Sequence, residues 1–105
     1  MIKEYKNGNI SIKFDRDTIT DINKGKIDAV EALLWELEWK DTYVIGEGYC
    51  LSNYDTGFTV YNCRLDKVYI VSGIALDKAA AGYTLKLYAL DPDEDNRELI
   101  AREGA

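Results

Sequence analysis

Residues 27–40 constrain the fold more than any other stretch, because only this run combines helical length with a regular helical period. At about 100° per residue, its larger apolar residues fall within about a third of the circle. A stripe of that width is typical of a helix packed on a core. We therefore predict a helix over 27–40 that turns this stripe inward. The stripe consists of Ile27, Val30, Leu33, Leu34 and Leu37.

The opposite side of this predicted helix combines carboxylates with two indoles and holds no cation. Trp35 and Trp39 are four residues apart and would lie next to each other on that side. Either they are buried under the N-terminal segment or a second copy of the chain, or they are exposed. Exposed, they would form a binding surface in which rigid rings supply contact area and charges select the partner. That side consists of Asp28, Glu31, Ala32, Trp35, Glu36, Glu38 and Trp39.

Length and composition indicate one soluble globular domain over residues 1–105. The chain is 47% apolar and 30% charged, and a chain of this length buries about 65% of its unfolded surface. No apolar run approaches the ~18 residues of a membrane helix. The first four residues, MIKE, lack the basic and then apolar pattern of a signal peptide. We therefore expect a cytoplasmic protein.

The net charge of −6 argues against direct binding to nucleic acid, whose phosphates require a basic patch. Two segments hold most of the excess negative charge. Residues 27–55 carry seven carboxylates and one cation, a balance of −6, and residues 91–105 carry six and two, a balance of −4. If the fold brings both segments to one side, their field could steer a basic partner. The alternative is that this charge only keeps the chain soluble.

The first third of the chain predicts a hairpin and a short helix. Asn7-Gly8 is a strong hairpin-turn signal within 2–14, and the apolar residues after it alternate with polar ones. Asp15 or Asp17 offers an N-cap for a short helix, which the Lys24-Gly25-Lys26 stop would end.

From residue 43 onward the pattern changes to that of strands, expected over 43–52, 58–64, 68–76 and 83–90. Gly46 and Gly48 suggest a bulge or a close backbone approach in the first of these. Residues 97–102 fit either a final strand or a terminal helix. Short connections favour antiparallel pairing. The expected fold is therefore α+β: an N-terminal β-hairpin, a short and a long helix, then an antiparallel β-meander packed against the long helix.

The chain contains no histidine, which removes Ser-His-Asp and Cys-His chemistry and the usual imidazole metal ligands. Asp55-Thr56-Gly57 resembles the signature of retroviral-type aspartic proteases, in which two subunits each supply one aspartate. The resemblance covers three residues and lacks the preceding apolar strand. A tight turn with Gly57 at a positive φ accounts for the same residues. We therefore predict no catalytic residue and no enzyme.

Residues 91–96 resemble the first half of an EF-hand calcium loop, with Asp91, Asp93 and Asp95 at loop positions 1, 3 and 5. The second half departs from the motif, because Glu98 stands at position 8 and Arg102 at position 12. A charged hairpin loop is the favoured interpretation, with weak calcium binding as its alternative. We predict no metal site and no cofactor.

Cys50 and Cys63 flank the Asp-Thr-Gly motif. A two-residue loop at Thr56-Gly57 would place them opposite each other, where a disulfide is conceivable. A three-residue loop would turn them to opposite faces. The cytoplasmic expectation favours reduced thiols in both cases.

In size, acidity and lack of histidine, the whole chain resembles the small orphan proteins of phages and mobile elements, among them anti-CRISPR proteins. The resemblance implies a non-enzymatic inhibitor in a bacterial host cell that binds a CRISPR effector, without direct contact to nucleic acid, by mimicking DNA. Two alternatives are an immunity or antitoxin protein against a basic nuclease, and a small-ligand module or enzyme with a site between helix and sheet. Both monomer and homodimer remain open. The predicted partner-binding residues are Asp28, Glu31, Trp35, Glu38, Trp39, Asp91, Asp93, Glu94 and Asp95.

Overall fold

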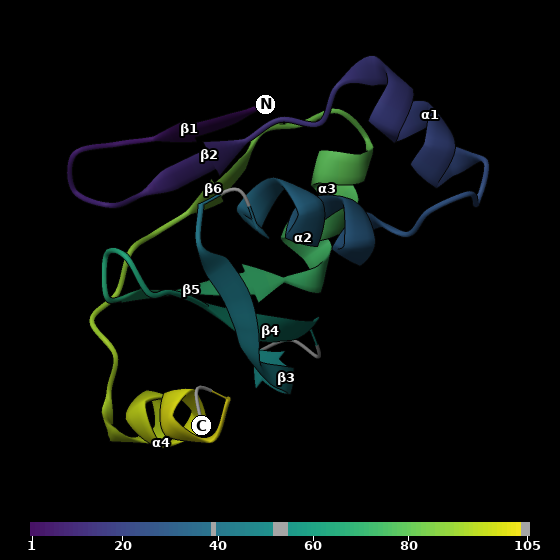
Figure 1. The fold of residues 1–105 in the computed structure, drawn as a ribbon. Helices are drawn as coiled ribbons and strands as arrows, with labels where there is room; N and C mark the ends of the chain where they lie inside the picture. The colour runs from purple at the N-terminus through teal and green to yellow at the C-terminus, as the bar shows by residue number, and fades with distance from the viewer. Residues whose placement is uncertain (39, 52–54, 104–105) are drawn as a thin grey trace.

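The computed structural model describes residues 1–38, 40–51 and 55–103. Within them the chain forms two three-stranded antiparallel sheets and four helices, which confirms the α+β class (Figure 1). In chain order the elements are β1 (Ile2–Glu4), β2 (Ile10–Ile12), α1 (Arg16–Asn23), α2 (Ala29–Glu38), β3 (Thr42–Leu51), β4 (Asp55–Asn62), β5 (Lys67–Ser72), α3 (Gly73–Ala80), β6 (Leu85–Leu87) and α4 (Glu94–Glu103).

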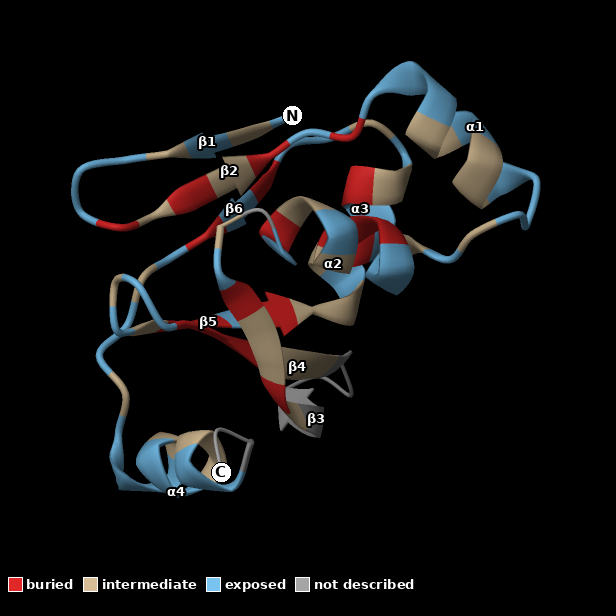
Figure 2. Cartoon of the chain, in the orientation of Figure 1, coloured by how far each residue is buried: buried red, intermediate tan, exposed pale blue. Residues whose placement is uncertain are grey.

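The first sheet has the strand order β1-β2-β6 and contains the predicted hairpin. Ile2 pairs with Ile12, and Ile10 pairs with Leu87 on the other side of β2. The turn residue Gly8 has a φ of 91°, which explains why a glycine stands there. The apolar residues of β2 and β6 are buried and face the helices, so the opposite face of this sheet points outward (Figure 2).

The second sheet is the predicted meander, β3-β4-β5. Its register shifts between Val44 and Gly46 and again between Glu47 and Tyr49, which confirms the bulge expected in this strand. β6 does not continue the meander. It crosses to the first sheet, so the expectation of one sheet that includes residues 83–90 is wrong in this respect.

The two predicted N-terminal helices are present. Asp15 caps α1 by accepting a hydrogen bond of 2.7 Å from the Thr18 N–H, and Gly25 follows the helix with a φ of 74°. α2 is shorter than predicted, because Asp28 acts as its cap and accepts a hydrogen bond of 2.9 Å from the Glu31 N–H.

The expectation of a strand over residues 68–76 is wrong beyond Ser72. The Ser72 hydroxyl accepts a hydrogen bond of 3.0 Å from the Ala75 N–H and so begins helix α3. Leu76 and Ala79, three residues apart, form the buried stripe of that helix. Residues 77–80 therefore belong to a helix where a loop was expected.

The inward face of α2 also differs from the expected stripe. Leu33 and Leu37 are buried as predicted, but Ala32 is only 2% exposed whereas Val30 is 38% exposed. The reason is α3, which packs beside α2 in the main core (Figure 1). Ala32 of α2 and Ala79 of α3 belong to the same core cluster, and small residues allow two helices to approach closely.

A second, smaller cluster lies on the other face of the second sheet. Residues 97–102 belong to α4, and its Leu99 and Ile100 pack against Ile45, Tyr61 and Val68. Asp93 and Asn96 cap the start of α4 by accepting hydrogen bonds from each other's backbone N–H, at 2.8 and 3.1 Å. No helix in the described chain is long and apolar enough to cross a membrane.

The Asp-Thr-Gly motif lies at the start of β4 and not in a turn, so that prediction is wrong. Gly57 has no positive φ; it pairs with Ser72, and a Cβ there would overlap the Val71 carbonyl oxygen. The connection between β3 and β4 falls on residues 52–54, outside the described residues.

The register also excludes the conceivable disulfide. Cys50 pairs with Thr56 at one end of the β3–β4 ladder. Cys63 lies at the other end, where its backbone N–H donates to the Asp41 carbonyl at 3.2 Å. The eight residues that separate the two ends along β3 span on the order of 25 Å.

Candidate functional site

The predicted partner-binding residues of α2 lie on one exposed side of that helix. At about 100° per residue, positions 28, 31, 35 and 38 fall within about a quarter of the circle. All four are exposed, and the Trp35 side chain is 56% exposed. Trp39 lies outside the described residues. We call Asp28, Glu31, Trp35 and Glu38 the acidic helix face.

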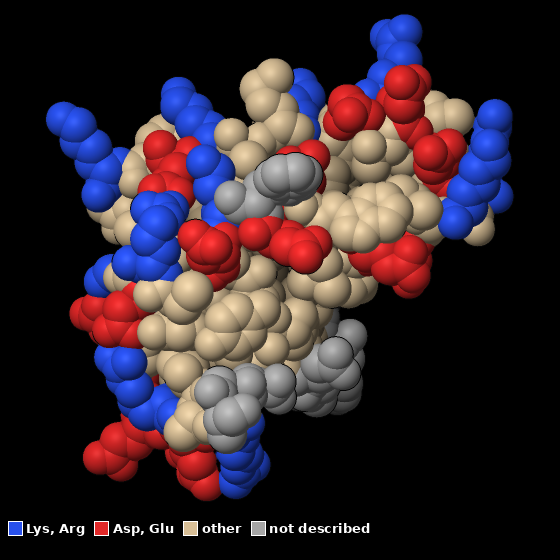
Figure 3. All heavy atoms as spheres, in the orientation of Figure 1, with Lys and Arg blue, Asp and Glu red and all other residues tan. Residues whose placement is uncertain are grey.

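The carboxylates of the acidic helix face form no ion pair within the described part of the chain. Every ion pair found there involves other carboxylates. Glu36 lies away from this face and accepts a hydrogen bond of 3.3 Å from the terminal amine of Met1. Carboxylates gather over α2 in the centre of Figure 3, around uncharged residues. The charge of this face is therefore available to a partner.

A hollow of about 540 Å³ adjoins the acidic helix face. Asp28 and Glu31 line it together with Asp77 and Lys26, and Ile22 and Ile27 supply apolar surface. A lysine or arginine from a partner could lay its aliphatic stem on that surface and place its charge among the carboxylates. Asp77 was not among the predicted residues because it belongs to α3.

The C-terminal acids do not join the acidic helix face. α2 packs on the core side of the second sheet and α4 packs on its other side, so the condition for a single acidic side is not met (Figure 1). Asp91 forms an ion pair with Lys67. Asp91, Asp93 and Asp95 line a cleft of about 370 Å³ between the sheet and α4, whereas Glu94 is exposed on the first turn of the helix.

Neither group of acids is arranged as a metal site. Among the described residues, no three His, Cys, Asp or Glu side chains lie close enough together to hold a metal ion. Asp93 accepts the hydrogen bond from the Asn96 N–H and serves as a helix cap.

The space between α2 and the second sheet, where the alternative small-ligand site was expected, is occupied by core side chains. Leu33, Leu37 and Val60 are fully buried in one cluster there. The described hollows lie instead on outer surfaces. One of them is on the outward face of the first sheet, between Tyr5 and Tyr88. The signal for it was the alternation of lysine and tyrosine at 3 and 5 and at 86 and 88.

A polar cluster fixes α4 to the second sheet. Arg97 donates to both carboxylate oxygens of Asp66, at 2.8 Å each, and the Tyr61 hydroxyl donates to Asp66 Oδ1 at 2.7 Å. The hydrogen bonds from Arg97 and Tyr61 lower the pKa of Asp66 to about 2. The hydrogen bond that Tyr61 donates to Asp66 raises the pKa of Tyr61, and burial adds a smaller increase. This cluster has a structural role, because it holds the second acidic segment in place.

No protein-family model matches this chain, and neither a curated protein nor a solved structure matches it.

Proposed function

We propose that this chain is a non-enzymatic interaction protein that binds a basic, nucleic-acid-handling protein through its acidic helix face. The observation that carries the proposal is the exposure of Trp35, a residue that is 56% exposed among carboxylates without ion-pair partners in the described chain. Large aromatic side chains are enriched among the residues that contribute most to protein interfaces.

The charges of the acidic helix face suit a surface that normally holds nucleic acid. Carboxylates three or four residues apart on a helix stand about 5–6 Å from each other, which is comparable to the spacing of phosphates along a strand. Such a helix can occupy a basic groove in place of DNA. Asp28, Glu31 and Asp77 around the adjoining hollow would receive a lysine or arginine of the partner.

Two partner classes fit this chemistry: a CRISPR effector, as the resemblance to anti-CRISPR proteins implies, and a basic nuclease that an immunity protein would neutralise. Both encounters would take place in the bacterial cytoplasm. The cleft lined by Asp91, Asp93 and Asp95 would offer a second acidic contact on another side of the molecule.

The first experiment captures partners with the tagged protein from host lysate and from lysate that contains candidate CRISPR effectors or nucleases. Capture is compared at about 50 mM and 500 mM salt, because screening weakens an electrostatic complex. We expect a stoichiometric basic protein that is released by high salt and competed by DNA. Absence of such a protein at both salt concentrations would contradict the proposal.

A pair of charge reversals then locates the contact. Glu31→Lys with Glu38→Lys changes the acidic helix face, and Glu94→Lys with Glu98→Lys makes the same charge change on α4, on the other side of the second sheet. We expect the α2 variant to lower the association rate about 10- to 100-fold at low salt and the α4 variant to have a much smaller effect. Equal effects would indicate only a net-charge effect, and loss confined to the α4 variant would place the contact on α4.

A further inference from the structure

The outward face of the first sheet is cationic although the chain as a whole is acidic. The first and last residues of β2 and of β6 are buried, so the residues that alternate with them along each strand point outward. Glu4 of β1 lies on the inner side, where it accepts a hydrogen bond of 2.6 Å from Arg64. No carboxylate is among the described residues that these strands turn outward. We call these residues, together with Lys6 of the turn after β1, the basic sheet face: Lys3, Tyr5, Lys6, Asn9, Ser11, Lys13, Lys86 and Tyr88.

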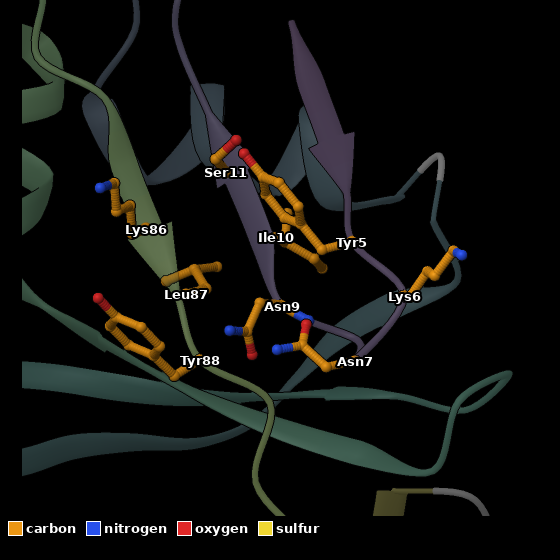
Figure 4. A pocket seen from close by; sticks show the side chains of 9 residues that line it. All are labelled: Tyr5, Lys6, Asn7, Asn9, Ile10, Ser11, Lys86, Leu87 and Tyr88. Atoms are coloured by element: carbon orange, nitrogen blue, oxygen red, sulfur yellow. The ribbon is translucent and has the colours of Figure 1, made fainter.

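Two tyrosines border a groove of about 580 Å³ on the basic sheet face. Figure 4 shows the Tyr5 ring next to Ser11 and the Tyr88 ring beside β6, with Asn9 between the two rings. Tyr5 is 46% exposed and Tyr88 is 63% exposed. The Lys3 ammonium lies 5.1 Å from the centre of the Tyr5 ring, so an aromatic surface and a cation are already adjacent.

These two tyrosines differ from Tyr61 and Tyr69 in the second sheet. Tyr61 and Tyr69 are buried, and each donates its hydroxyl to a hydrogen-bond acceptor within the chain. Tyr5 and Tyr88 instead present ring surface to solvent beside Lys86 and the other lysines of the face. Rings that do not contribute to the core are available to a flat ligand.

We propose that the basic sheet face binds single-stranded nucleic acid, with bases stacked on Tyr5 and Tyr88 and phosphates paired with the surrounding lysines. Unpaired bases stack on exposed aromatic side chains of a sheet, and a positively charged groove follows the backbone. Lys6 and Lys86 line the groove, and Lys3 and Lys13 extend the positive charge beyond it. That spread matches an extended polyanion better than a free nucleotide, which favours an enclosed pocket.

The acidic balance of the chain does not oppose this site. The carboxylates of the acidic helix face lie on α2. This helix packs in the core that the inward face of the first sheet also borders, away from the outward face. In Figure 3, cations project around the hairpin at the left, whereas carboxylates gather over α2. The inference therefore goes beyond the proposed function and does not depend on it.

The test measures fluorescence anisotropy of a labelled oligothymidine of about twelve nucleotides at about 50 mM salt. We expect the logarithm of the association constant to fall linearly with the logarithm of the salt concentration. The slope should reach about −3, since each lysine–phosphate contact adds about −0.7. Tyr5→Ala and Tyr88→Ala should each weaken binding about fivefold or more, whereas Tyr5→Phe keeps the stacking ring and should retain it. Lys86→Ala should reduce the slope by about 0.7.

The matched control is Tyr83→Ala, because Tyr83 is exposed and does not line the groove. Circular dichroism melts verify that each variant is folded. Absence of binding by the wild-type chain, or equal loss in the Tyr83 control, overturns the proposal. The proposal is also overturned if poly-glutamate or heparin binds as tightly as the oligothymidine and the tyrosine variants do not change that binding. The face would then be an unspecific polyanion-binding surface. Competition by free thymidine monophosphate as strong as by the strand would assign the site to free nucleotides instead.

Discussion

The two three-stranded sheets differ in what they turn away from the main core. The first sheet turns lysines, tyrosines and Ser11 outward, and no described helix covers them (Figure 2). The second sheet has apolar side chains on both faces: Val60 and Val71 belong to the main core, whereas Ile45 and Val68 belong to the smaller cluster under α4. One sheet therefore needs a single covering layer and the other needs two.

This difference follows from the strand sequences. β2 reads Ile-Ser-Ile, with one apolar face, whereas β5 reads Lys-Val-Tyr-Ile-Val-Ser, with apolar residues at consecutive positions. A strand of the second kind is stable only when both faces are covered. α4 supplies the second layer, and a sheet face that no element covers and that carries charge and exposed rings is a place to look for a ligand.

The largest expected effect is on stability, and it distinguishes the central strand of the second sheet from that of the first. Gly57→Ala in β4 would push a Cβ into the Val71 carbonyl, a backbone atom that moves only if the ladder moves. We expect a loss of about 2–4 kcal/mol in the free energy of unfolding. Ser11→Ala in β2 faces the open groove and should change it by less than about 0.5 kcal/mol. Urea unfolding measures both. Similar losses would contradict the contrast between the sheets.

A smaller effect is expected where the second sheet contacts the hairpin. The buried Tyr69 hydroxyl donates to the Gly8 carbonyl at 2.7 Å. Tyr69→Phe leaves that carbonyl without its partner and should cost about 1–2 kcal/mol. Tyr61→Phe is the matched control, because its acceptor Asp66 is exposed and water can replace the hydroxyl; we expect a loss below about 1 kcal/mol. A larger loss in the control would mean that α4, and not the hairpin contact, limits stability.

Local signals predicted much of the fold. The Asn7-Gly8 turn, the Asp15 cap and the bulge at Gly46 each depend on residues close in the sequence, and all three are present. The position of β6 depends on pairing with β2, some 75 residues earlier, which no local pattern specifies. α3 was missed because apolar residues resume directly after Ser72 and Gly73, and only the hydroxyl cap of Ser72 marks the change.

The two proposed binding surfaces were predictable only in part. The orientation of α2 is set by α3, so the pattern alone could not decide whether Val30 or Ala32 faces the core, although it correctly grouped Asp28 and Glu31 away from Leu33. Segment charges were misleading for a different reason. A strand has two faces, and summing charge along it combines the inward Glu4 with the outward Lys3. The basic sheet face is therefore invisible in any count of net charge.

The smallest effect concerns the attachment of α4 and depends on pH. Because Arg97 and Tyr61 hold the pKa of Asp66 at about 2, below its ordinary value of 3.8, the folded chain binds this proton more weakly than the unfolded chain does. The contribution of Asp66 is thus fully present above about pH 4 and is lost as the pH falls toward 2. Asp66→Asn is a suitable comparison, because the backbone there has a φ of 54°, which asparagine tolerates. We expect the wild-type advantage over this variant in urea unfolding to shrink from pH 5 to pH 2 and to shrink also at high salt, since the group is exposed. A constant difference across that range would mean that the carboxylate charge does not hold α4, and that apolar packing of Leu99 and Ile100 alone covers the second sheet.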